Sequence, residues 1–226
     1  MIQLSPRLKA CCDWVRPGDR VADIGCDHGY LGISLLQSGR ASLVIAADLR
    51  QQPLESARRN AARYGVASRM AFYLSDGAAD IPRDFDTLIC AGMGGDTMIS
   101  ILQAAPWLCS PSYRLILQCQ SRQPRLRSYL TTHGWTIPRE IPLRDGRFLY
   151  TVLEAVPGSG EPLTPGQCWL SPALLQSGSP LVPEYCRRML RLMAAEAEHQ
   201  PDPACRQALD EAAAAAAPYL TGGEPR

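Results

Sequence analysis

Short apolar runs alternate with amphipathic segments through residues 4–155 of the chain. Apolar side chains first repeat with helical spacing over residues 4–15. The continuous apolar runs that follow are typical of buried strands in a parallel sheet. We therefore expect strands at residues 20–24, 42–47, 70–74, 86–90 and 113–119. Helices are expected between them at residues 30–37, 53–64, 94–104 and 124–133.

A hairpin closes this alternating part of the chain. Residues 135–143 and 147–155 have strand composition, and Arg144-Asp145-Gly146 between them is typical of a tight turn. Strands separated by helices predict βαβ units and hence a parallel sheet, to which the hairpin adds an antiparallel strand. Five parallel strands followed by such a hairpin resemble the sheet of Rossmann-like class I methyltransferases, so the predicted fold class is α/β.

The pattern changes after residue 155. Half of residues 156–183, 14 of 28, are proline, glycine or serine, which indicates a linker or an irregular segment. Helices are expected at residues 184–199 and 203–217, and a frayed tail, above all after Pro218, is the alternative. The predicted organisation is a sheet domain at residues 1–155, a linker at 156–183 and a small helical appendage at 184–226.

Composition excludes some classes of protein. The chain has 226 residues, 46% of them hydrophobic and 20% charged, as in ordinary globular proteins. It has no apolar run long enough to span a membrane and no signal-peptide pattern at its start, so we expect a cytoplasmic protein. Nine cysteines without a C-x-x-C pair give no support for a zinc site, and we expect no metal.

Three acidic residues follow three successive predicted strands. Asp23 opens the loop Asp23-Ile24-Gly25-Cys26-Asp27-His28-Gly29, in which Gly25 allows a tight turn and Gly29 allows close packing of a helix on a strand. Asp48 ends the second strand, where an acidic side chain suits a ribose diol, and Asp76-Gly77 follows the third. Strand ends of a parallel sheet meet at one edge, so these residues predict a nucleoside site.

The loop favours S-adenosylmethionine over a dinucleotide. A dinucleotide site needs G-x-G-x-x-G, whereas this loop reads D-x-G-x-D-x-G and its Asp27 would repel a pyrophosphate. S-adenosylmethionine is cationic and has no phosphate. Ala91-Gly92-Met93-Gly94-Gly95 places bare backbone at the end of the fourth strand. The residues expected to bind this cofactor are Arg7, Asp23, Gly25, Cys26, Gly29, Asp48, Leu49, Asp76, Gly77, Ala91, Gly92 and Met93.

Four motifs together are more specific. ADIGCDHGYL, AGMGGD, LILQ and DGRFLYTV resemble, in this order, the motifs of the bacterial tRNA (adenine-22-N1)-methyltransferase family, often called TrmK. The resemblance covers about residues 4–155 well and the rest loosely. It implies a Rossmann-like domain with a small helical C-terminal domain, S-adenosylmethionine as cofactor, and methylation of a D-arm adenine of tRNA at N1. The chain departs from the family at Gly32 and at Cys119-Gln120.

Methylation of adenine N1 needs no nucleophile from the protein, because the ring nitrogen has a free lone pair. We expect Asp27 to stabilise the cationic base, or else to cap the following helix. His28 could move a proton or orient the loop, Tyr30 could stack on the base or pack in the core, and Gln118 could bond the base edge or be an ordinary strand-end residue. Arg7 could hold the cofactor carboxylate or an RNA phosphate, or lie on the surface.

Basic residues concentrate in one segment. Residues 112–150 carry 7 basic and 2 acidic side chains in a chain of net charge +1. We expect the RNA backbone to contact Arg122, Arg125, Arg127, Arg144, Arg147, Arg187, Arg188 and Arg191. Two alternatives remain: a methyltransferase acting on another RNA, DNA or a small molecule, and a non-catalytic protein that binds S-adenosylmethionine or RNA. We expect a monomer.

Overall fold

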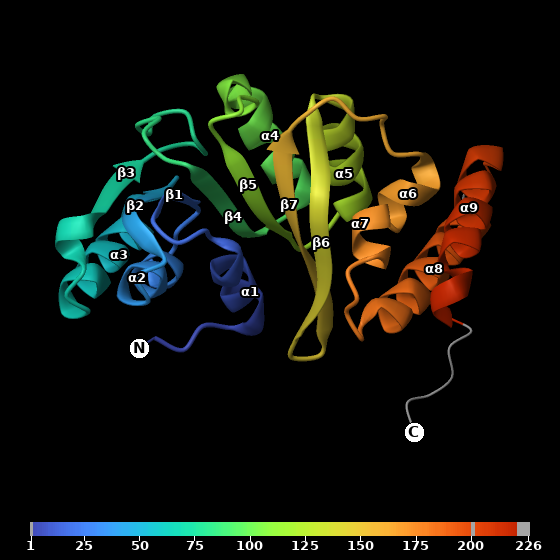
Figure 1. The fold of residues 1–226 in the computed structure, drawn as a ribbon, viewed down its shortest axis with the longest axis horizontal. Coiled ribbons are helices and arrows are strands. Elements are labelled where there is room, and N and C mark those ends of the chain that lie inside the picture. The colour runs from blue at the N-terminus through green and yellow to red at the C-terminus, as the bar shows by residue number, and fades with distance from the viewer. Residues whose placement is uncertain (1, 200–201, 221–226) are drawn as a thin grey trace.

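A seven-stranded mixed sheet forms the centre of the molecule (Figure 1). The computed structural model describes residues 2–199 and 202–220. The strand order is β3-β2-β1-β4-β5-β7-β6, and among these described strands β7 alone runs opposite to the other six. The strands are β1 Asp19–Ile24, β2 Ala41–Asp48, β3 Met70–Leu74, β4 Thr87–Met93, β5 Arg114–Cys119, β6 Trp135–Asp145 and β7 Phe148–Pro157. The predicted α/β class and Rossmann-like methyltransferase sheet are confirmed.

Helices cover both faces of the sheet. The helices of the sheet domain are α1 Pro6–Trp14, α2 Tyr30–Gln37, α3 Gln51–Arg63, α4 Gly95–Ala104 and α5 Gln123–Thr132. Two single 3₁₀ turns, η1 Ala67–Arg69 and η2 Pro106–Leu108, lie in the connections. The predicted elements differ from these bounds only at their ends, because the apolar runs mark buried residues rather than backbone hydrogen bonds.

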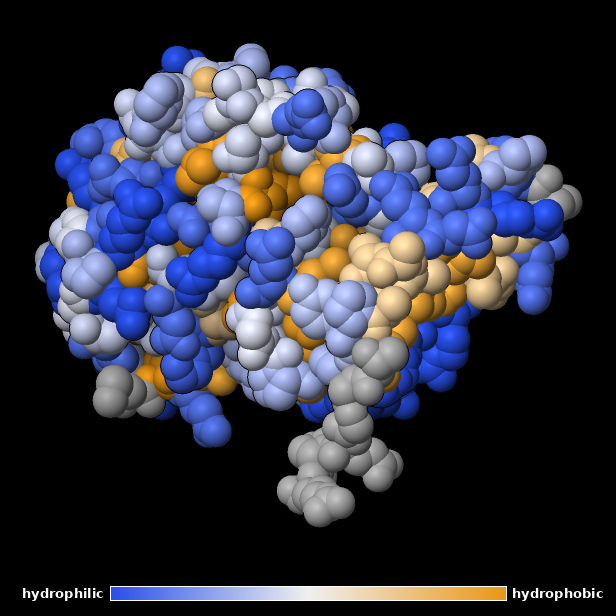
Figure 2. Space-filling view, turned by 45° about the vertical axis from the view of Figure 1, so that its right-hand side comes forward, coloured by the Kyte–Doolittle hydropathy of each residue, from blue (hydrophilic) through white to orange (hydrophobic). Residues whose placement is uncertain are grey.

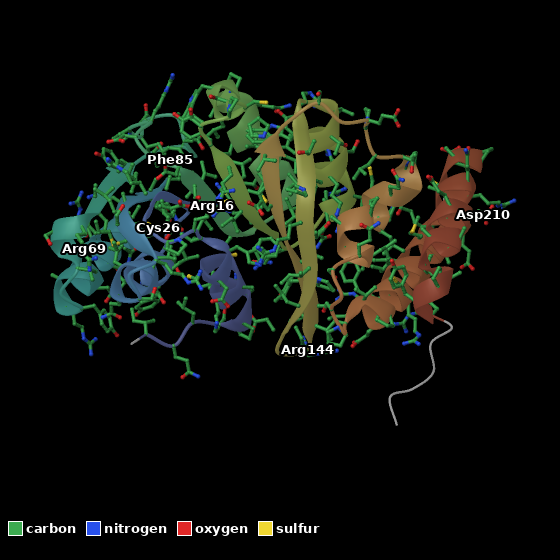
Figure 3. The ribbon with its side chains drawn as sticks, viewed as in Figure 1. Arg16, Cys26, Arg69, Phe85, Arg144 and Asp210 are labelled. Carbon is green, nitrogen blue, oxygen red and sulfur yellow. The ribbon has the colours of Figure 1, made fainter. Side chains whose placement is uncertain are left out.

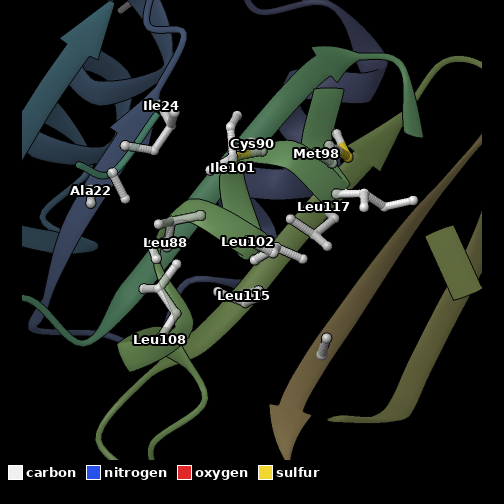
Figure 4. Packing of buried hydrophobic residues seen from close by; sticks show 14 of the residues in the cluster. Ala22, Ile24, Leu88, Cys90, Met98, Ile101, Leu102, Leu108, Leu115 and Leu117 are labelled. Carbon is white, nitrogen blue, oxygen red and sulfur yellow. The ribbon is translucent and has the colours of Figure 1, made fainter. Parts of the chain in front are cut away.

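Alternation along the strands divides the core between the two faces. Val21, Val44 and Ile89 pack with α1, α2 and α3. Their neighbours Ala22 and Leu88 point to the opposite face, where they pack with α4 and α5 (Figure 4). Successive side chains of a strand point to opposite faces, so a strand covered on both sides must be apolar throughout.

The C-terminal region packs as a third apolar cluster against the end of the sheet. Its helices are α6 Pro165–Trp169, α7 Pro172–Leu175, α8 Val182–His199 and α9 Pro203–Leu220. Residues 156–183, expected as a linker or an irregular segment, thus contain two short helices, and α9 continues past Pro218 to Leu220. Figure 2 shows this region projecting from the body of the molecule. The division into domains at residues 155 and 184 stays a prediction.

Candidate active site

A cavity of about 470 Å³ opens at the carboxyl ends of the parallel strands. The strand order reverses between β1 and β4, which is where open α/β sheets bind their ligands. The loop after β1, marked by Cys26 in Figure 3, forms part of its wall. The predicted residues that line it are Arg7, Asp23, Gly25, Cys26, Asp27, His28, Tyr30, Asp48, Leu49, Asp76, Gly77, Ala91, Gly92 and Met93. The structure therefore brings together nearly all of the predicted cofactor-binding residues.

The loop after β1 has an unusual backbone. Gly25 has φ +70°, and a Cβ placed on it would lie 2.2 Å from Met93 Cε, so a larger residue would displace the Met93 side chain at the end of β4. Asp27 has φ 49°, which is rare for residues other than glycine but is tolerated by aspartate. Its carboxylate is 64% exposed at the mouth of the cavity, with Oδ2 3.7 Å from His28 Nε2. The loop thus presents a charged oxygen to whatever enters.

Asp23 is the buried acid of the site. It is 3% exposed, and Oδ2 has no hydrogen-bond partner in the part of the chain that the structure describes. Burial raises the pKa of this carboxyl, the backbone amide of Gly32 lowers it, and the charge of Asp48 raises it, so that the pKa lies at about 7. A buried acceptor without a partner is costly, so Asp23 is poised to receive a cation or a proton.

The raised pKa of Asp23 predicts that stability falls as pH rises. Between about pH 4 and 7 the folded protein binds more protons than the unfolded chain, so the free energy of unfolding decreases across this window. Without a ligand, we expect a loss on the order of 2 kcal/mol between about pH 5 and 7 from this group. Denaturant titrations of wild type and Asp23→Asn at several pH values would measure it. If the free energy of unfolding depended on pH identically in both proteins, the raised pKa of Asp23 would be contradicted.

Backbone amides orient the second acid, Asp48. Its Oδ2 accepts from the amide of Asp27 at 3.3 Å, and Oδ1 accepts from the amide of Arg50 at 3.0 Å. The carboxylate is 7% exposed and lines the cavity. Asp48 therefore links the loops after β1 and β2, and its carboxylate still lines the cavity.

Several cavity residues were not predicted. Ser75 directly follows β3; its Oγ donates to the carbonyl of Gly77 and accepts from the amide of Asp80, both at 3.0 Å, which shapes the loop that carries Asp76. Its place at a strand end was the signal that could have identified it. The others are Leu8, Ile24, Leu31, Arg50 and Thr97.

Gln118 and Gly29 do not lie where the sequence suggested. For Gln118, the base edge and an ordinary strand-end position were both open; it is fully buried, and its Oε1 accepts from the amide of Gly92 at 3.0 Å and from Arg7 Nη1 at 3.3 Å. Gly29 does not line the cavity; a Cβ on it would lie 2.9 Å from Ala57 Cβ, so it serves the close helix packing that its position also suggested.

Arg127 is the clearest correction to the predicted RNA surface. It is fully buried, its Nη2 lies 2.6 Å from Glu140 Oε1, and its Nη1 donates to the carbonyl of Cys168 at 2.7 Å. Tyr185 and Ser171 complete this network. Arg127 therefore holds the C-terminal region against the sheet and cannot reach RNA.

The other predicted arginines lie near the carboxyl edge or on α8. Arg122 and Arg125 both pair with Asp96, at 3.2 and 2.9 Å. Arg144, labelled at the tip of the β6–β7 hairpin in Figure 3, pairs with Glu184 of α8, and Arg147 lies over the ring of Phe148. The tip is at the same edge as the cavity, because β7 starts opposite the end of β5. The rest lie on α8: Arg187 and Arg191 are exposed, and Arg188 is half-buried.

The fold and the cavity define a methyltransferase domain, and the family described as "Methyltransferase domain" matches residues 4–153. The chain belongs to this family, and it is similar to tRNA (adenine-22-N1)-methyltransferases, as its motifs predicted.

Named relatives support the assignment. The tRNA (adenine(22)-N(1))-methyltransferase of Bacillus subtilis is 31% identical over 158 residues, which are 70% of this chain and 66% of that protein. The chain thus matches just under two thirds of the length of this relative.

Solved structures extend the similarity to nearly the whole chain. The B. subtilis m1A22 tRNA methyltransferase TrmK matches with TM-score 0.79 and 26% identity, covering 95% of this chain and 96% of that one. A Streptococcus pneumoniae protein described as a candidate tRNA (m1A22) methyltransferase was solved in complex with S-adenosyl-L-methionine. It matches with TM-score 0.82 and 27% identity, covering 96% of this chain and 100% of that one.

No helix in residues 2–199 or 202–220 combines the length and apolarity needed to span a bilayer. Across the same residues, no three His, Cys, Asp or Glu side chains gather as metal ligands would.

Proposed function

We propose that this protein transfers a methyl group from S-adenosylmethionine to N1 of adenine 22 in tRNA. The observation that carries this proposal is the exposed Asp27 carboxylate at the mouth of a cavity whose buried wall carries Asp23 and Asp48. The two buried acids suit a cationic cofactor, and the exposed Asp27 carboxylate suits an adenine that becomes cationic when it is methylated. The relatives with this activity share the fold across nearly the whole chain.

The residues of the cavity fit the cofactor. The unpartnered Oδ2 of Asp23 suits the ammonium group of its amino-acid part, and Asp48 at the end of β2 suits the ribose diol. Asp76, exposed after β3, can accept from the adenine amino group, and Leu49 offers an exposed apolar side chain for the ring. When bound, S-adenosylmethionine supplies an activated methyl group on a sulfonium.

The protein's own contribution is positioning and charge. Adenine N1 carries a lone pair at neutral pH, so the chain needs to place the base in line and exclude water. Asp27 stabilises the positive charge that the adenine ring acquires during the transfer. Tyr30 is 39% exposed, with its ring centroid 5.8 Å from that of His28, so the pair offers an aromatic wall for a base turned out of its stack.

A basic surface at the same edge supports an RNA substrate. Arg122, Arg125, Arg144 and Arg147 lie at the carboxyl end of β5 and at the hairpin tip, beside α8 with its exposed Arg187 and Arg191. Phosphate contacts fix the orientation of a nucleic acid without reading its sequence. A tRNA substrate favours a cytoplasmic location, and we infer that the protein acts there as a monomer.

Replacement of Arg187 and Arg191 by alanine should weaken tRNA binding and reduce its salt dependence. Each lost phosphate contact lowers the slope of log affinity against log salt by about one unit or less. Arg188 is left in place because its Nη1 donates to the carbonyl of Leu149 at 3.1 Å and so has a structural role. Fluorescence titrations at several salt concentrations would measure the slope. An unchanged slope would remove α8 from the RNA surface.

The proposed function is tested with an unmodified tRNA transcript that has adenine at position 22. The purified protein is incubated with this transcript and S-adenosylmethionine, and nucleosides are analysed by mass spectrometry. We expect 1-methyladenosine from this transcript and none from a matched transcript with guanine at that position. Methylation of both transcripts would favour another nucleotide or another RNA, and binding of the cofactor without any product would favour the non-catalytic alternative.

A further inference from the structure

Arg7 lies where three parts of the fold meet. It belongs to α1, its Nε is 3.3 Å from Asp145 Oδ2 at the hairpin tip, and its Nη1 donates to Gln118 Oε1 at the end of β5. Arg7 and Asp145 are only 28% and 23% exposed. Arg7 also lines the cavity, so the contacts that hold it act on the wall of the active site.

Gln118 links Arg7 to the carboxyl end of β4. Its single side-chain oxygen accepts from both Arg7 Nη1 and the amide of Gly92, and the residue is fully buried. Gly92 has φ +82°, and a Cβ placed on it would lie 2.8 Å from Arg7 Nη1. The guanidinium therefore lies directly against bare backbone, which a side chain at position 92 would prevent.

The hairpin that carries Asp145 is itself held in place. Asp145 pairs with Phe148 across a two-residue turn in which Gly146 has φ +59°, as the first position of such a turn requires. On its other side, Arg144 pairs with Glu184 and Leu149 packs in the C-terminal apolar cluster. Asp145 thus presents its carboxylate from a fixed base.

We propose that Asp145 is a positioning residue that orients Arg7 to bind the carboxylate of the cofactor's amino-acid part; this rests on the proposed function. Arginine has five N–H donors arranged to grip a carboxylate in a fork. Within the described part of the chain, Asp145 engages Nε and Gln118 engages one donor of Nη1, which leaves the others for a ligand. An arginine already held in place loses less side-chain freedom when the ligand binds.

Two ligands separate this role from general support of the fold. S-adenosylhomocysteine contains the amino-acid part with its carboxylate, whereas 5′-methylthioadenosine keeps the nucleoside and the sulfur but lacks that part. Calorimetric titration of both ligands with wild type, Asp145→Ala, Arg7→Ala and the double variant is the experiment. In Asp145→Ala, Arg7 is no longer held in position, which predicts about three- to tenfold weaker binding of S-adenosylhomocysteine.

The expected pattern has two parts. Asp145→Ala binds 5′-methylthioadenosine as wild type does, and in the Arg7→Ala background it causes no further loss for S-adenosylhomocysteine, because both residues act through one guanidinium. Equal weakening of both ligands, unchanged S-adenosylhomocysteine binding, or additive losses in the double variant would each overturn the proposal. Asp145→Asn keeps the turn preference and an acceptor, so it replaces Asp145→Ala if that variant unfolds. Weaker binding of S-adenosylhomocysteine alone by Asp145→Asn would support the proposal. Wild-type affinity of this variant for both ligands at every pH would overturn the proposal.

A matched control and the wild type complete the design. Asp13→Asn removes an exposed carboxylate that pairs with Lys9 on the same helix; neither residue lines the cavity, so both affinities should stay unchanged. Wild-type protein that binds neither ligand would contradict the proposed cofactor itself. Wild-type binding with no selective effect of Asp145 would contradict only the positioning role.

Discussion

Asp27→Asn should lower the rate of methyl transfer by about a hundredfold or more while cofactor affinity changes little. The amide preserves the shape of the side chain, and asparagine tolerates the left-handed backbone at this position, where φ is 49°. What is lost is the negative charge that faces the adenine ring as it becomes cationic. Single-turnover rates with saturating cofactor and tRNA, together with calorimetric cofactor binding, would separate the two effects.

His28→Gln is the matched comparison for Asp27→Asn, because it changes the neighbouring residue of the same loop. His28 lies 3.7 Å from the Asp27 carboxylate, so its loss should affect the rate less if it only orients that group. If Asp27→Asn turned over at the wild-type rate, the carboxylate would not stabilise the reacting base. A His28 effect equal to that of Asp27 would instead assign proton transfer to the histidine.

Arg127→Ala should destabilise the protein by about 3–5 kcal/mol. The replacement leaves Glu140 fully buried without its cationic partner, and it also removes the hydrogen bond to the carbonyl of Cys168. For a chain of this size, the loss corresponds to a fall in melting temperature of roughly 6–20 °C. Thermal and denaturant unfolding followed by circular dichroism would measure both quantities.

Arg125→Ala tests whether the stability loss in Arg127→Ala comes from the buried position or from the removal of any arginine of α5. Arg125 is on the same helix two residues earlier, but it is exposed and pairs with Asp96 at the surface. Exposed pairs contribute about 0–1 kcal/mol, so this variant should unfold almost as wild type does. Equal stability of the Arg125 and Arg127 variants would show that the buried network does not hold the C-terminal region on the sheet.

Much of the fold and most of the cavity could be predicted from sequence because both depend on local order. Buried strands must be apolar, and β3 and α2 were predicted to the residue, as Met70–Leu74 and Tyr30–Gln37. The carboxyl ends of parallel strands meet at one edge, so polar residues that follow them must lie near one another. Asp23, Asp48 and Asp76 were found in this way, without knowledge of any contact.

Residue type and charge alone could not distinguish the arginines. Arg125 and Arg127 are alike in sequence, yet α5 exposes one and buries the other beside Leu126 and Leu130. Arg127 does share the helical spacing of the apolar stripe, but a charge belongs there only if a partner arrives from elsewhere. Glu140 of β6 supplies that partner, and only the packing of β6 against α5 brings it there.

Contacts between distant segments also determine the roles of the residues behind the cavity wall. Gln118 is polar at a strand end, which suggested a role at the base, but Arg7 lies 111 positions earlier in the chain and takes up its oxygen. Asp145 looked like an ordinary turn residue until the hairpin placed it against the same guanidinium. Local pattern predicts which strand ends carry chemistry, whereas hydrogen bonds across the fold decide which side chains face the ligand and which hold others in place. The physical reason is that each buried polar atom needs a partner, and the partner's identity depends on the packing of the whole chain.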